Sequence, residues 1–134
     1  MRRHNIFVSH SWSYSERYTS MMQLLNSQSY FQFKNYSVPE VKAFGLLRIN
    51  TMKEELRQQI RPAHCVIIIG GMWFNHSDWI KFEMDEALRM AKPILGVRPR
   101  GQKRMPTEVA MNADEVVNWN GKSIADAVKR ISTA

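Results

Sequence analysis

The sequence predicts a three-layer α/β sandwich around a five-stranded parallel sheet. Short apolar runs rich in β-branched residues alternate five times with helical patterns. The links from strand to helix are short, and such units require right-handed crossovers between parallel strands. For five units the flavodoxin-like strand order 2-1-3-4-5 is the leading topology, with a ligand crevice between the first and third strands. We expect a single domain over residues 1–134, long enough to bury a core without metal or disulfide support.

The first expected strand covers residues 5–9 and leads into a hydroxyl-rich loop. Ser15 at the end of this loop is placed to cap a helix over residues 16–27. The apolar positions of this helix recur at three- and four-residue steps: Tyr18, Met21, Met22 and Leu25. Residues 30–38 alternate loosely, as an outer strand does, and Pro39 ends them.

Residues 40–50 show no clear period, and we expect a loop there. Thr51 and Glu54 form a capping box that predicts a helix over residues 51–60, and Pro62 stops it.

The clearest strand covers residues 65–69, Cys-Val-Ile-Ile-Ile. A run this short, stopped by Gly70 and Gly71, is typical of a strand buried on both faces. Ser77 then offers an N-cap oxygen, and Asp78 places a negative charge at the positive end of a new helix. The expected core stripe of this helix is Ile80, Met84, Ala87, Leu88 and Ala91.

The last third of the chain repeats the alternation. It predicts a strand over residues 93–97, a short helix over 107–111 and a strand over 115–119. Gly121 turns the chain into a final helix over 123–131. The side chains of that helix expected to face inward are Ile124, Val128 and Ile131.

The charge, the cysteine content and the apolar runs of the sequence limit the classes of function that we expect. The formal charge of +7 could indicate nucleic acid, but the basic residues are spread from Arg2 to Arg130, and only residues 92–104 form a dense patch. Cys65 is the single cysteine, so there is no disulfide framework and no zinc spacing. The N-terminal residues run straight into a short strand, so we expect no secretory leader, and no eighteen apolar residues follow one another. We therefore expect a cytoplasmic protein that uses neither membrane nor nucleic acid.

Glu83 stands apart in its helix. It falls about 40° off the edge of the apolar stripe, directly below Trp79 one turn earlier. A carboxylate at the rim of a core, beside the carboxyl end of a strand, is placed to meet a ligand. The alternative is a half-buried helix glutamate that pairs with a nearby cation.

Several chemistries lack their motifs. There is no phosphate-binding P-loop and no G-x-G-x-x-G, and Asn5 and Ser9 stand where a phospho-accepting receiver needs acidic residues. The histidines are isolated from one another, so no metal site is expected. His10 and Ser11 are adjacent, which is the wrong geometry for a serine nucleophile and its base. A flavin, held by the hydroxyl-rich loop and stacked on Trp12 and Trp73, stays open.

The sequence resembles the bacterial TIR-like family, flavodoxin-like relatives of Toll/interleukin-receptor domains. The resemblance lies in residues 7–12 (Phe-Val-Ser-His-Ser-Trp) after a short strand, and in Ser77, Trp79 and Glu83 after the strand at 65–69. It continues through residues 93–99, 113–120 and 123–124, and so covers most of the chain.

This resemblance implies cleavage of the nicotinamide glycosidic bond of NAD, in some members with cyclisation to a cyclic ADP-ribose signal, as in Thoeris-type antiphage systems. NAD is then the substrate, and no cofactor is implied. By matching position, Glu83 corresponds to the essential glutamate of the family. The expected substrate-binding residues are Ser9, His10, Ser11, Trp12, Gly70, Gly71, Trp73, Trp79 and Arg98.

Many TIR domains are adaptors, so a non-catalytic interaction or nucleotide-sensing module is the competing interpretation. Phe82 is expected to be exposed, and a self-association surface along its helix would explain it; packing under a neighbouring loop is the alternative. We therefore expect a homo-oligomer and a downstream effector protein as partners.

Overall fold

The computed structural model describes residues 3–9, 16–35, 49–69, 73–98 and 105–132. For residues 16–19, 35, 49–52 and 73–79 the backbone alone is described. Every structural statement below concerns these parts of the chain.

The strands form one parallel sheet with the order β2-β1-β3-β4-β5, which confirms the predicted topology. The strands are β1 (Arg3–Ser9), β2 (Gln32–Asn35), β3 (Cys65–Ile69), β4 (Ile94–Val97) and β5 (Glu115–Val117). β3 lies in the middle of the sheet, and all five of its residues are buried, as its uninterrupted apolar run predicted.

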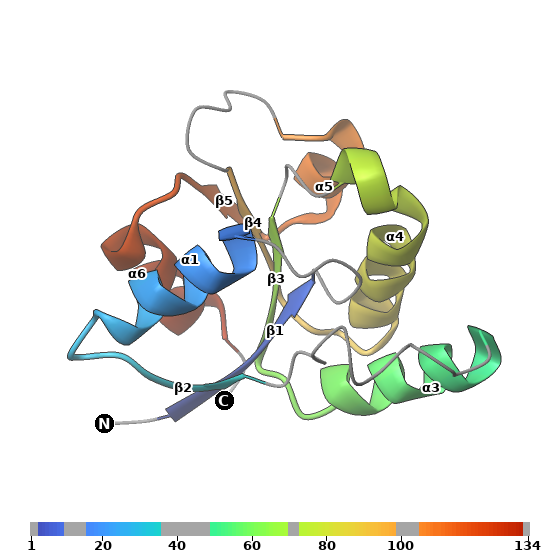
Figure 1. Ribbon diagram of the computed structural model, residues 1–134, viewed down its shortest axis with the longest axis horizontal. Helices are drawn as coiled ribbons and strands as arrows, with labels where there is room; N and C mark the ends of the chain where they lie inside the picture. The colour runs from blue at the N-terminus through green and yellow to red at the C-terminus, as the bar shows by residue number, and fades with distance from the viewer. Residues whose placement is uncertain (1–2, 10–15, 36–48, 70–72, 99–104, 133–134) are drawn as a thin grey trace.

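Helices cover both faces of this sheet (Figure 1). They are α1 (Glu16–Asn26), α3 (Ile49–Ile60), α4 (Trp73–Arg89), α5 (Thr107–Asn112) and α6 (Gly121–Ile131). α1 and α6 pack together on one face, and α3 and α4 pack together on the other, where α5 also lies. This arrangement is the three-layer α/β sandwich expected from the sequence.

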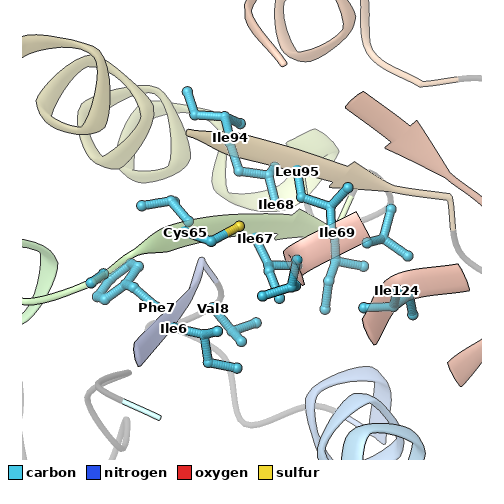
Figure 2. Close-up of a cluster of buried hydrophobic side chains, with 14 of the residues drawn as sticks. Ile6, Phe7, Val8, Cys65, Ile67, Ile68, Ile69, Ile94, Leu95 and Ile124 are labelled. Atoms are coloured by element: carbon cyan, nitrogen blue, oxygen red, sulfur yellow. The ribbon is translucent and has the colours of Figure 1, made fainter. Parts of the chain in front are cut away.

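The core lies on both sides of the central strands. Figure 2 shows its aliphatic side chains around β3, with Ile67 and Ile69 on the same side of the strand as Ile124 of α6. Successive side chains of a strand point to opposite faces, so Val66 and Ile68 face the α3–α4 layer. The thiol of Cys65 is buried in this core, and burial raises its pKa far above the ordinary value, so it stays a neutral, inert packing group.

α4 begins four residues earlier than Ser77, at Trp73. Only residues 70–72 separate α4 from β3 in the sequence. Ser77 and Asp78 are the fifth and sixth residues of α4, beyond the first four backbone N–H groups that an N-cap side chain would satisfy. Prediction of Ser77 as the N-cap was wrong for this reason.

Compared with the predicted core stripe, the buried face of α4 is rotated around the helix toward Glu83. Ile80, Met84 and Ala87 are buried as predicted, but Leu88 is 45% exposed. Leu88 lies about 90° around the helix from the middle of the buried face, which Glu83 shares. Ala91 is also exposed, because α4 ends at Arg89 and the chain reverses at Ala91 with a φ of 56°.

The other element ends differ from the predictions by a few residues. β2 covers only the middle of the predicted 30–38 strand, and Pro39 lies outside the described residues, as does most of the predicted 40–50 loop. α3 already begins at Ile49, so that the predicted capping box lies within its first turns. α6 begins at Gly121 because the side-chain oxygen of Asn120 caps it, accepting a hydrogen bond from Ser123 N at 2.9 Å.

Gly121 also lets α6 approach α1 closely. A Cβ atom at this position would lie 3.0 Å from the carbonyl oxygen of Leu24. The expected inward residues Ile124 and Val128 are fully buried beyond this contact, and Ile131 packs against the core.

Within the described segments, α4 and the other helices are all too short or too polar to cross a membrane. The same segments contain no cluster of three or more histidine, cysteine or acidic side chains that would hold a metal ion.

Candidate functional site

A buried carboxylate lies at the carboxyl end of β1. The Glu83 side chain is fully buried, and its Oε1 accepts a hydrogen bond from the Ser9 hydroxyl at 2.5 Å. Ser9 is the last residue of β1 and is itself fully buried. The two residues are 74 positions apart in the sequence, so the fold alone brings them together.

The sheet topology explains why these two residues meet. β1 pairs with β2 on one side and β3 on the other, and Ser9 stands opposite Ile68 near the carboxyl end of β3. α4 follows β3 and packs on the same face as α3, which places its third turn beside the end of β1. In open parallel sheets this edge, where the connections from β1 and β3 lead to opposite sides, is where ligands bind.

The contact between Ser9 and Glu83 is short, with 2.5 Å between the hydroxyl oxygen and Oε1. Hydrogen bonds from a hydroxyl to an ionised carboxylate typically span about 2.5–2.7 Å. The distance therefore suits a serine hydroxyl that donates to a carboxylate, and the donor itself is neutral.

One turn further along α4, Glu86 has a different environment. Its carboxylate oxygen Oε1 is 2.6 Å from Nε of Arg57 in α3 and 3.0 Å from Nη2 of Arg89. The hydrogen bond from Arg89, and then that from Arg57, lower the pKa of Glu86 against the opposing effect of its burial. Both guanidinium groups thus pair with Glu86, and the pair with Arg57 ties α4 to α3.

Phe82 packs beside this ion pair and against the core. Lys53 Nζ and the Arg57 guanidinium carbon each lie 5.3 Å from the centre of its ring. Phe82 is therefore half-buried between α4 and α3. Phe82 is thus only partly exposed, and α3 rather than a loop contacts its ring; self-association stays a prediction.

The structure describes the remaining predicted site residues to different extents. His10, Ser11, Trp12, Gly70 and Gly71 lie outside the described residues, although they directly follow β1 and β3 in the chain.

Trp73 and Trp79 belong to α4 by their backbone, and their side chains are not described. Arg98 directly follows β4, and its backbone N–H donates a hydrogen bond to Val117 O. Its side-chain Nη1 donates a second hydrogen bond to Asn118 Oδ1 at 3.3 Å. It lies two strands away from Ser9 in the sheet.

Sequence reasoning found both members of the buried pair but not their contact. Ser9 was predicted to bind substrate, and its hydroxyl is directed to Glu83. Side chains alternate along β1, so Ser9 lies on the same face of the sheet as Phe7, and Ile6 and Val8 lie on the opposite face. This alternation was the signal in the sequence that could have indicated the contact.

The chain is similar to known proteins both in sequence and in structure. Residues 7–104 match the sequence model of the family described as "Thoeris protein ThsB, TIR-like domain". No curated protein matches the chain.

Among solved structures, the chain is similar to the CMP N-glycosidase BcmB of Clostridium botulinum, with a TM-score of 0.54 and 11% identity. The match covers 94% of this chain and 98% of that one. At this identity the likeness establishes a shared fold.

Proposed function

This chain belongs to the Thoeris ThsB TIR-like domain family, and on that premise we propose that it cleaves the nicotinamide N-glycosidic bond of NAD. The observation that carries the proposal is the fully buried Glu83 carboxylate, fixed by Ser9 at the ligand-binding edge of the sheet. The solved structure of similar fold is named a CMP N-glycosidase, a protein that breaks the same class of bond.

The chemistry requires a negative group beside the sugar. When the bond between ribose C1′ and the pyridinium nitrogen breaks, both bonding electrons leave with nicotinamide, which departs as a neutral molecule. Positive charge then builds up on C1′ and the ribose ring oxygen. The Glu83 carboxylate stabilises this oxocarbenium-like state and accepts hydrogen bonds from ribose hydroxyls.

No strong general acid is needed, because the leaving group is already cationic in NAD. Water completes hydrolysis by adding its oxygen to C1′ and releasing a proton, which gives ADP-ribose. An adenine nitrogen of the same molecule completes cyclisation instead, which gives a cyclic ADP-ribose. We propose that such a product acts as a signal to an effector protein in antiphage defence.

The loops beside Glu83 supply the rest of the site in this proposal. Ser11 and Trp12 follow Ser9 directly, and Gly70 and Gly71 follow β3, so both loops start at the edge where Glu83 lies. A hydroxyl and an indole suit ribose hydroxyls and the stacking of a base, while Arg98 suits the pyrophosphate.

The test is to incubate the concentrated protein with NAD, and in parallel with CMP, and to separate the products by chromatography. We expect nicotinamide from NAD, together with ADP-ribose or a cyclic isomer. A matched Glu83→Gln variant keeps the shape and removes the charge, and should release no nicotinamide above background. Cytosine release from CMP alone would replace NAD as the substrate. Binding of NAD without turnover by the wild-type protein would favour the non-catalytic sensing module.

A further inference from the structure

We infer that Ser9 is a positioning residue that acts through Glu83 rather than on the substrate. This inference rests on the proposed function, since it assigns the part that Ser9 plays in the same site. It also differs from the sequence-based prediction, in which Ser9 contacts the substrate directly.

The hydrogen bond itself carries the first step. A serine hydroxyl has a single proton to donate. That proton is directed to Glu83 Oε1 at 2.5 Å, and the Ser9 side chain is fully buried. The Ser9 hydroxyl therefore has no second proton to donate to a ribose oxygen while it binds Glu83.

The backbone of Ser9 carries the second step. β1 pairs with β3 as far as its last residue, where Ser9 stands in register with Ile68, and all side chains of β3 are buried. A hydroxyl attached to this part of the sheet is a fixed reference point. Glu83, in contrast, reaches its position through three rotatable bonds from a separate helix, and an unrestrained glutamate loses that geometry.

The third step concerns the charge of Glu83. A donor that binds the ionised form favours it over the protonated form. A neutral donor does so without cancelling the negative charge, whereas a guanidinium, as at Glu86, also supplies positive charge. The Ser9 hydroxyl thus favours the ionised form of Glu83, which is the form that stabilises a developing cation.

The experiment compares Ser9→Ala with Ser9→Thr in the nicotinamide release assay. We expect Ser9→Ala to lower kcat about 10- to 100-fold, with KM for NAD changed less than about threefold, because orientation acts mainly in the transition state. The acid limb of the pH–rate profile should move to higher pH. Ser9→Thr keeps the hydroxyl and should restore most of kcat; a rise in KM without a fall in kcat would overturn the inference.

A second comparison separates positioning from substrate contact. NAD affinity is measured by calorimetry for Glu83→Gln alone and together with Ser9→Ala. If Ser9 acts through Glu83, the two proteins bind NAD equally within about twofold. A further loss of affinity in the double variant would show that Ser9 touches the substrate.

A third measurement does not depend on catalysis, so the failure of the proposed function is distinguishable from the failure of this inference. The side-chain carboxyl carbon of Glu83 is followed by NMR against pH, with the signal assigned from its absence in Glu83→Gln. The titration midpoint should be higher in Ser9→Ala than in wild type, and Ser9→Thr should return toward wild type. Equal midpoints in all three proteins would overturn the inference even if NAD is not the substrate.

Discussion

Glu83 and Glu86 are the same residue type on the same helix, three positions apart, and both are buried. Glu86 is held by two guanidinium groups, one from α3 and one from its own helix. Glu83 accepts a hydrogen bond from a serine hydroxyl at the end of β1. The difference teaches that burial alone does not define the role of a carboxylate: the cations at Glu86 fasten two helices together, while the Ser9 hydroxyl ties Glu83 to the end of a strand in the sheet.

The largest expected effect tests the position of the Glu83 charge. Glu83→Asp keeps the charge but withdraws it by one methylene from both Ser9 and the proposed sugar. A displacement of this size costs about 100-fold in rate when geometry controls the reaction. We therefore expect nicotinamide release at saturating NAD to fall about 100-fold. Glu86→Asp is the matched control and should change the rate less than about twofold; equal losses in both variants would remove the distinction between the two glutamates.

The next effect tests the structural part of the comparison. Glu86→Gln removes the charge that binds Arg57 and Arg89, and should lower the free energy of unfolding by about 1 kcal/mol, since both guanidinium groups can regain water. The pKa of Glu86 is lowered in the folded protein, so its contribution is present at neutral pH and is lost as pH falls below about 4.3. Denaturant unfolding at pH 7 and pH 3 measures both values.

The difference in stability between wild type and Glu86→Gln should therefore become smaller from pH 7 to pH 3. Asp126, whose pKa is lowered by hydrogen bonds from Lys122 and Tyr30, contributes equally to both proteins and cancels in the difference. A stability difference that stays constant from pH 7 to pH 3 would contradict the ion-pair account.

The smallest expected effect separates stability from catalysis in the helix that carries both glutamates. Ala91 has a φ of 56° just after α4, a conformation that glycine adopts without strain. Ala91→Gly should raise the free energy of unfolding by about 0.5–1 kcal/mol and leave nicotinamide release unchanged. Thermal unfolding checks the first value, and a changed rate would mean that the stability of α4 itself limits turnover.

The fold could be predicted from the sequence because its signals are local. The apolar run at Cys65–Ile69 and the short links to the helices define a parallel sheet, and the number of units favours one strand order. Element ends were less accurate where two local signals compete. At α4 the helix begins at Trp73, four residues before the capping residue Ser77 that the sequence favoured.

The site could be predicted only in part. Glu83 stood out by its place at the rim of the apolar stripe, and the resemblance to a known family assigned it a role. Its contact with Ser9 joins residues 74 positions apart, and the contact of Glu86 with Arg57 joins residues 29 positions apart. The periodicity of a helix or strand cannot predict contacts between residues so distant in the sequence. The covering of Phe82 by α3 was missed for the same reason, since it depends on how two helices pack.

The most direct test of the account is the rate of nicotinamide release by Glu83→Gln and by Glu86→Gln, measured with NAD in one assay at equal protein concentration. The account predicts that the first falls below about 1% of the wild-type rate, as expected when a group that stabilises transition-state charge is removed. The second should stay within about twofold of wild type. Release that persists in Glu83→Gln, or that is lost equally in both, would contradict the assignment of Glu83 as the catalytic carboxylate.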